Sequence, residues 1–260
     1  MKKRIVALVL AILTGLMTLS LTGCGPKSDI DYVKEKGELV VGITDFEPMD
    51  YQDKSGNWIG FDADMATVFA ESLGVKVKFI EIEWDNKILE LQNRSIDCVW
   101  NGMTLNDEVK ASMECSKPYC NNAQTVIVNK ADAGKYKTVE ACKGLTFAVE
   151  AGSAGEKEAT ASGFKVVPVK DQATALMEVK SGTCNATVID KLMAAAMVGD
   201  GTAYSDLTYT IDLNAEEYGV GFRKGSELAE ELNKFLDEKS ADGTMKKIAE
   251  KYGVQAALIK

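Results

Sequence analysis

Short apolar runs alternate with amphipathic segments along most of the chain. The runs are rich in valine and isoleucine, which favours buried strands, and the segments between them carry apolar residues at helical spacing. This alternation predicts a mainly parallel α/β sheet, because parallel strands need a crossover, which is usually helical. The predicted strands are 38–44, 75–81, 124–129, 145–149, 165–169 and 186–189, and the predicted helices are 62–73, 84–92, 171–181, 226–239 and 244–252.

The stretch from Asp97 to Val109 contains the sharpest change of pattern. The residues at 98–100 favour a strand, and Gly102 allows the chain to turn, so we expect the strand to stop abruptly there. Asn106 or Asp107 can then cap the next helix, as Asp62 can cap the helix 62–73. Ligands of α/β proteins bind beyond the carboxyl ends of strands, so this stretch is a candidate binding edge.

The N-terminus has the pattern of an export signal. Three basic residues at 2–4 precede an apolar run at 5–19, and Leu-Thr-Gly-Cys follows at 21–24. That tetrapeptide resembles the bacterial lipobox, which implies cleavage before Cys24 and a lipid on its thiol. We therefore expect a signal peptide at 1–23 and a lipid anchor and tether at 24–36. A transmembrane anchor is the alternative, although the apolar run is borderline in length for one.

Charge and composition exclude several classes of protein. The 260 residues carry a net charge of −9, and the leader holds three of the basic residues and no acid, so the part from Cys24 onward carries −12. Such an acidic chain is a poor nucleic-acid binder. No histidine is present, which excludes Ser-His and Cys-His nucleophile pairs and removes the commonest zinc ligand. We expect no cofactor and no metal. No Gly-rich phosphate loop followed by lysine is present either, so the chain is not an ATPase.

Five cysteines remain after Cys24, and none forms a CxxC pair. Export permits disulfides, and Cys115 and Cys120 are close enough in sequence to pair. Buried free thiols are the alternative, and the spacing does not decide between the two.

Several motifs occur in the order found in one known family. They are a strand followed by T-D-x-x-P at 44–48, Gly-Phe-Asp at 60–62, the run at 97–109, Ser-Lys-Pro-Tyr at 116–119 and Tyr-Gly-Val-Gly-Phe-Arg at 218–223. Together they resemble the amino-acid-type, family 3 solute-binding proteins of bacterial ABC transporters. The resemblance implies the type II periplasmic binding fold, with two Rossmann-like α/β lobes joined by a two-strand hinge. Lobe 1 would hold 37–122 and 219–260, and lobe 2 would hold 123–218.

The resemblance also assigns roles at the cleft between the lobes. Phe46 and Trp84 stand where the family places two aromatics around the ligand's side chain, and aromatic faces also attract cations. Asp190 stands where the family's aspartate receives the ligand's α-ammonium, although it is equally placed to cap the next helix. Asp45 matches an acid that faces the distal cation in similar binders of basic amino acids.

The other predicted contacts lie at strand ends and at a helix start. Thr104 matches the threonine that grips the ligand's α-carboxylate in the family, although its hydroxyl could instead satisfy local backbone. A helix start at 152–155 offers backbone N–H groups to an anion, although a plain tight turn is the alternative. The full set of these contacts is Asn101, Gly102, Thr104, Val109, Glu150, Ser153 and Ala154.

Val109 is the main departure from the family pattern, because the family has a carboxylate-binding arginine there. Three alternatives stay open. The helix start near Glu108 holds the carboxylate alone, another cation such as Lys110 or Arg223 replaces the arginine, or the ligand is an amine that lacks the carboxylate.

These observations predict a monomeric, non-enzymatic lipoprotein on the outer face of a bacterial membrane. It would capture a small polar solute, an amino acid with the basic ones among the candidates, and deliver it to the permease subunits of an ABC importer. One rival is a cleft enzyme of the cyclohexadienyl-dehydratase type, for which Glu150 and Asp190 are the candidate acid and base. A sensor that signals through a separate partner is the other.

Overall fold

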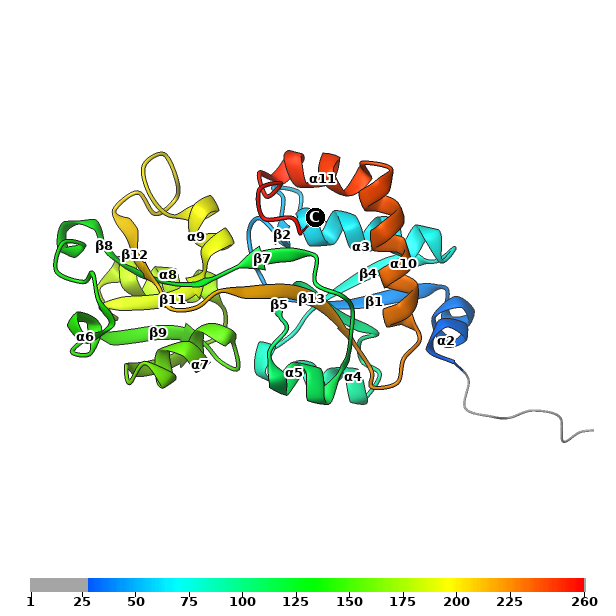
Figure 1. Ribbon diagram of the computed structural model, residues 1–260, viewed down its shortest axis with the longest axis horizontal. Helices are drawn as coiled ribbons and strands as arrows, with labels where there is room; N and C mark the ends of the chain where they lie inside the picture. The colour runs from blue at the N-terminus through cyan, green and yellow to red at the C-terminus, as the bar shows by residue number, and fades with distance from the viewer. Residues whose placement is uncertain (1–27, 260) are drawn as a thin grey trace, which may run out of the picture.

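The computed structural model describes residues 28–259, which form two α/β lobes side by side (Figure 1). The predicted fold class is confirmed, since each lobe has its own sheet with helices on both faces. The predicted signal peptide and Cys24 lie outside the described residues. No helix between residues 28 and 259 combines the length and the apolar character that crossing a membrane requires.

Lobe 1 is built on a six-stranded sheet in the order β4-β1-β5-β13-β6, with β7 also paired to β13. Strands β4 and β5 run parallel to β1, and β13 returns antiparallel to β5. A small hairpin of β2 (Tyr51–Gln52) and β3 (Trp58–Ile59) lies outside this sheet. The strands of the sheet are β1 (Glu38–Ile43), β4 (Lys76–Glu81), β5 (Cys98–Thr104), β6 (Glu114–Cys115), β7 (Cys120–Asn122) and β13 (Glu216–Phe222).

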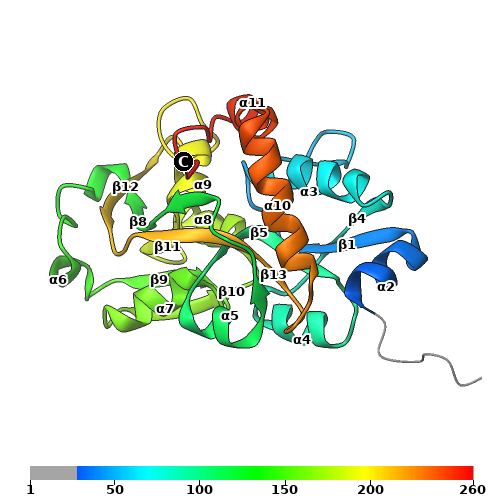
Figure 2. The same ribbon diagram turned by 45° about the vertical axis from the view of Figure 1, so that its right-hand side comes forward.

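The helices of lobe 1 cover both faces of its sheet. Successive residues of β1 face opposite sides, so Leu39 and Val41 pack on α3, α10 and α11, whereas Val40 packs toward α4 and α5. Figure 2 shows α10 in front of the sheet. Burial on both faces explains the nearly continuous apolar pattern of the strand. These helices are α2 (Asp29–Lys36), α3 (Phe61–Ser72), α4 (Lys87–Gln92), α5 (Asp107–Ser112), α10 (Leu228–Ala241) and α11 (Thr244–Tyr252).

Lobe 2 repeats this plan with a five-stranded sheet in the order β10-β9-β11-β8-β12. Phe147 of β9 stacks on Phe164 with ring centroids 4.3 Å apart, and Ala148 faces the other side toward α8. The strands are β8 (Gln124–Asn129), β9 (Thr146–Glu150), β10 (Lys165–Val169), β11 (Ala186–Asp190) and β12 (Leu207–Asp212). The helices are α6 (Val139–Cys142), α7 (Ala154–Ala161), α8 (Gln172–Ser181) and α9 (Lys191–Met197).

Two adjacent crossovers join the lobes. The chain passes from β7 to β8 through Ala123 and comes back from β12 to β13 through residues 213–215, and the two passages run side by side (Figure 1). Glu216 pairs with Asn122 at the start of β13, so the return strand begins before the predicted boundary at 219.

Four local predictions differ from the structure. Residues 29–36, expected to be part of a tether, form helix α2, because Ser28 caps it and Val33 is buried against lobe 1. Strand β5 does not stop before Gly102 but continues through it to Thr104, with the glycine at φ 53°. Asp62 does not cap α3, because its carboxylate accepts hydrogen bonds from the chain at Gly102 and from Tyr119. The segment 84–92 opens with a 3₁₀ turn (η1, Trp84–Asn86) before α4.

Other local predictions are confirmed. Strand 124–129 and helix 244–252 have the expected bounds, and Asn106 caps α5 through the N–H of Val109. The five described cysteines have free thiols, so Cys115 and Cys120 are not paired in this structure.

Candidate functional site

The lobes enclose a cavity of about 500 Å³, its opening to solvent included. Every predicted site residue except Asp45 lines this cavity. Asp45 is exposed and lies outside the lining, so its contact with a ligand stays a prediction. Gly152 and Glu108, which belong to the two helix starts proposed to bind an anion, also line the cavity. The lining residues that the sequence reasoning did not propose as contacts are Lys87, Ile88, Met103, Asn106 and Gln172.

An aromatic wall covers the lobe 1 side of the cavity. Phe46 and Trp84 are both buried, and Phe46 meets Tyr218 edge to face with ring centroids 6.3 Å apart. Gly102 makes room for Phe46, because a Cβ at that position would lie 2.5 Å from its ring. The strand therefore passes close under the aromatic ring only because residue 102 is glycine.

The polar side chains of Asn101 and Thr104, in the last part of β5, form hydrogen bonds with residues of lobe 1 and of the crossover strands. The amide of Asn101 exchanges hydrogen bonds with Thr44 and donates to Asp50 at 2.8 Å. The hydroxyl of Thr104 donates to Glu216 at 3.0 Å, so its proton points away from any ligand carboxylate in this arrangement.

Asp190 lies at the end of β11 inside a ring of hydrogen-bond donors. Its Oδ1 accepts from Asn122, Gln124 and the hydroxyl of Tyr218, and its Oδ2 accepts from Gln172 at 2.5 Å. It occupies the N-cap position of α9 but makes no capping hydrogen bond with its side chain, so that alternative is not realised. Burial and the nearby charge of Glu216 raise its pKa to about 7, although the hydrogen bonds from Tyr218, Gln172 and Gln124 act in the opposite direction.

Glu150, the last residue of β9, is a second buried acid in the cavity. Its side chain is 3% exposed, and its Oε1 has no hydrogen-bond partner among the described residues. Burial raises its pKa to about 8, helped by the charges of Asp190 and Asp171 and opposed by that of Lys87. A buried carboxyl oxygen without a partner can accept a hydrogen bond from a ligand.

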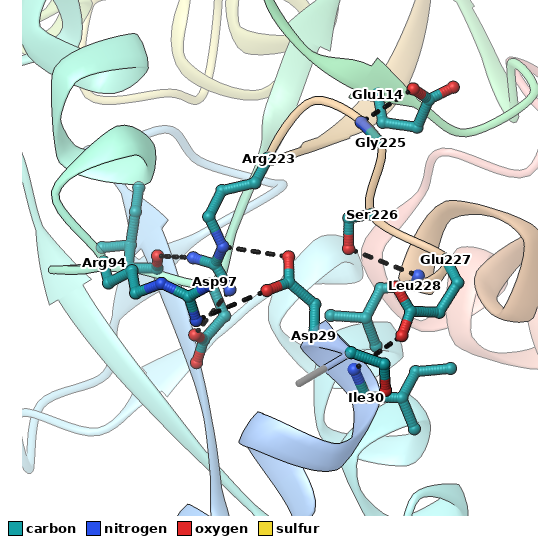
Figure 3. Close-up of polar contacts among 12 residues, drawn as sticks. Asp29, Ile30, Arg94, Asp97, Glu114, Arg223, Gly225, Ser226, Glu227 and Leu228 are labelled. Atoms are coloured by element: carbon teal, nitrogen blue, oxygen red, sulfur yellow. Dashed lines mark hydrogen bonds and ion pairs between the residues drawn. The ribbon is translucent and has the colours of Figure 1, made fainter. Parts of the chain in front are cut away.

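The structure rules out two cations proposed to replace an arginine at Val109. Arg223 belongs to a charge cluster at the far end of lobe 1, where Nε binds Asp29 at 2.9 Å and an NH group lies 3.3 Å from Asp97 (Figure 3). Lys110 is exposed and does not line the cavity. Val109 itself is buried in the lining.

Lys87 is the cation that the sequence reasoning missed. It follows Trp84 by three residues and precedes Leu91 by four, so it lies on the buried face of the helix. Its ammonium donates to the carbonyls of Trp84 and Gly152, both at 3.0 Å. A lysine at a helical position flanked by a buried tryptophan and a buried leucine was the signal available in the sequence.

The lobes are in contact around this cavity. Lys87 of lobe 1 bonds the lobe 2 carbonyl of Gly152, and Lys170 of lobe 2 pairs with Glu81 of lobe 1. Ser153 caps α7 through the N–H of Glu156, so the predicted helix start is present at the cavity wall. Between residues 28 and 259, no cluster of histidine, cysteine or acidic side chains is arranged to hold a metal ion.

Known proteins with this fold show the same organisation. The model of the bacterial extracellular solute-binding proteins, family 3, matches residues 39–255. The L-cystine-binding protein TcyJ of Escherichia coli K12 is 30% identical and aligns over 92% of this chain and 94% of its own. The arginine-binding extracellular protein ArtP of Bacillus subtilis is 30% identical over 97% of this chain and 98% of its own.

A solved structure agrees with these sequence relatives. The P235GK mutant of ArgBP from T. maritima superposes with a TM-score of 0.81 at 35% identity, covering 86% of this chain and 98% of that one. One relative has an enzyme's name, the cyclohexadienyl dehydratase of Pseudomonas aeruginosa, at 29% identity over 65% of each chain. The family match spans most of the chain, and the cavity lies between two lobes as the resemblance implied. The chain therefore belongs to the family 3 bacterial extracellular solute-binding proteins.

Proposed function

We propose that this chain is the solute-binding lipoprotein of an ABC importer and captures a small polar solute, an amino acid, between its lobes. The observation that supports this most directly is the pair of buried acids in the cavity, Glu150 and Asp190. Burying carboxylates is costly because they lose their solvation by water. A ligand that carries an ammonium group would offset this cost by pairing with them.

The wall of the cavity suits the rest of such a ligand. Glu150 offers an oxygen without a partner, and a charge-assisted hydrogen bond to it is stronger than a neutral one. Phe46 and Trp84 offer apolar faces to the stem of a side chain. Relatives named for binding cystine and arginine are consistent with an amino acid that has a cationic group at each end or a second cationic group on its side chain.

In this proposal ligand binding favours the closed pair of lobes, and the closed form delivers the solute to the permease subunits as a monomer. Export and attachment to the outer face of the membrane would rest on lipid at Cys24. Recovery of the protein expressed in its native membrane system from the soluble fraction alone would contradict the lipid anchor.

The test of the ligand class is a thermal-shift screen of the purified protein against amino acids, amines and polyamines, followed by calorimetry. Ligands that bind the folded state raise the melting temperature. Asp190→Asn should weaken binding of the best amino acid by about thirty-fold or more, the lower range for losing one partner of a buried charge pair. Asp200→Asn is the matched control, because Asp200 is an exposed acid of the same lobe. A screen without any response from amino acids would refute the proposal.

Catalysis on the same site is the second candidate, because Glu150 has the raised pKa that a general acid needs and one relative is a dehydratase. We propose binding without turnover. Incubating the protein with its best ligand and analysing the solution by mass spectrometry should return the ligand unchanged. A product that accumulates with time would show the cleft to be an active site.

A further inference from the structure

Lys87 is a buried ammonium whose hydrogen-bonding capacity is only partly used. Its side chain is 7% exposed and lines the cavity. Two of its three N–H groups point to the carbonyls of Trp84 and Gly152, each 3.0 Å away. No hydrogen-bond acceptor among residues 28–259 takes the third N–H, and Nζ lies 4.8 Å from the centroid of the Trp84 ring.

The charge of Lys87 has no close counter-ion in the described part of the chain. Among residues 28–259, no carboxylate lies within the 4.0 Å that defines an ion pair with Nζ. Glu150, Glu108 and Asp85 lie near enough to favour its charged form, but burial outweighs them and lowers its pKa. The ammonium is held by two neutral carbonyls and by the face of the Trp84 ring. A buried cation without a paired anion is costly, so an anion bound beside it would offset part of that cost.

The surroundings of Lys87 offer further groups to an anion. Its partner Gly152 directly precedes Ser153, the N-cap of α7, an eight-residue helix whose first N–H groups have no acceptor within the helix. The hydroxyl of Thr104 and the amide of Asn101 donate elsewhere. Val109 offers no polar atom in its side chain.

We propose that Lys87 receives a carboxylate of the ligand, in the place where an arginine at position 109 is absent. This inference rests on the proposed amino-acid binding and specifies it. The ligand carries a carboxylate near Lys87 and the start of α7, and an ammonium near Asp190 and Glu150. Amines that lack a carboxylate leave the third N–H of Lys87 unpaired and bind more weakly.

The experiment compares each amino acid with its decarboxylated partner by calorimetry. The probe pairs are L-arginine and agmatine, L-histidine and histamine, and L-cystine and cystamine. Wild type should prefer the amino acid of the best-bound pair by about thirty-fold or more. Lys87→Met and Lys87→Gln should lose most of that preference, while affinity for the amine stays nearly constant. Two variants of different polarity, each checked by its melting temperature, guard against one failing to fold.

Lys170→Met is the matched control. Lys170 also bridges the two lobes, through Glu81, but it does not line the cavity, so its removal should leave the preference unchanged. If Lys87 only latches the lobes together, its variants lose affinity for the acid and the amine alike, and the inference is wrong. Equal binding of both partners by wild type also overturns it. Binding of no amino acid by wild type refutes the proposed function, and this inference with it.

Discussion

The stability of the ligand-free protein should fall as pH rises from 6 to 9, and Glu150 should cause a substantial part of the fall. Its pKa is about 8 in the folded protein and 4.5 when exposed. Between these values the folded state holds a proton that the unfolded state has lost, so the free energy of unfolding decreases with pH. The stabilising contribution is complete below pH 4.5 and is lost as pH passes 8.

The size of the effect follows from that proton. At pH 6 the folded state binds about one more proton than the unfolded state, and at pH 8 about half a proton more, while one pH unit corresponds to about 1.4 kcal/mol per proton. Glu150 therefore contributes a loss of about 2 kcal/mol over this range. Asp190 and Asp62, each with a pKa of about 7, add smaller losses in the same direction. Burial also raises the pKa of Asp50, which adds a further loss.

The assay is urea unfolding of ligand-free protein at a series of pH values, for wild type and Glu150→Gln. The glutamine has the same shape and does not titrate, so the variant should lose less stability between pH 6 and pH 9. Glu140→Gln is the control, since the Glu140 side chain is 81% exposed and pairs only with Lys143 in the same turn. Parallel curves for wild type and Glu150→Gln would mean that Glu150 is already ionised in the folded protein, and the burial argument would be wrong.

Two further predictions concern lobe closure and the charge cluster. Gly152→Ala should weaken ligand binding tenfold or more by calorimetry, because the new Cβ would lie 2.6 Å from the Cα of Asp85 in the facing lobe. Gly163→Ala is the control and should bind ligand normally, because Gly163 has a similar φ but no atom within 4 Å of the new Cβ. Equal affinities of the two variants would show that the lobes do not close this tightly on the ligand. Arg223→Met should lower the free energy of unfolding by about 3 kcal/mol, because it leaves buried Asp29 and Asp97 with less compensation, and it should leave affinity unchanged. A loss of affinity at full stability would place Arg223 in the ligand site after all.

The sequence predicted the parts of the fold that depend on local pattern. Strand 124–129 alternates between two buried faces and helix 244–252 begins and ends at glycines, so both were recognisable from neighbouring residues alone. Asp62 was misread because its true partners, the Gly102 N–H and the Tyr119 hydroxyl, lie 40 and 57 residues away. An acid at a helix start satisfies the capping pattern whether or not it faces the core.

The candidate site shows the same limit. Asp190 was predicted because it ends a strand where the family's aspartate stands, and Glu150 also ends a strand; both line the cavity. Lys87 was missed because its partner Gly152 belongs to the other lobe, 65 residues away. The same helical pattern that buries a leucine also buries a lysine, and the sequence does not show which carbonyls accept hydrogen bonds from that lysine.

Strand β13 should tolerate substitutions of its side chains but not insertions or deletions. Within a few residues of this strand, Glu216 accepts a hydrogen bond from Gln124 and the Tyr218 hydroxyl donates one to Asp190. The register against β5 then shifts near Gly221, and Arg223, which follows the strand, pairs with Asp29 at the other end of the lobe. Inserting or deleting one residue would turn every later side chain to the opposite face. Libraries that seek new ligand preferences should therefore vary side chains here at constant length and place insertions in exposed loops.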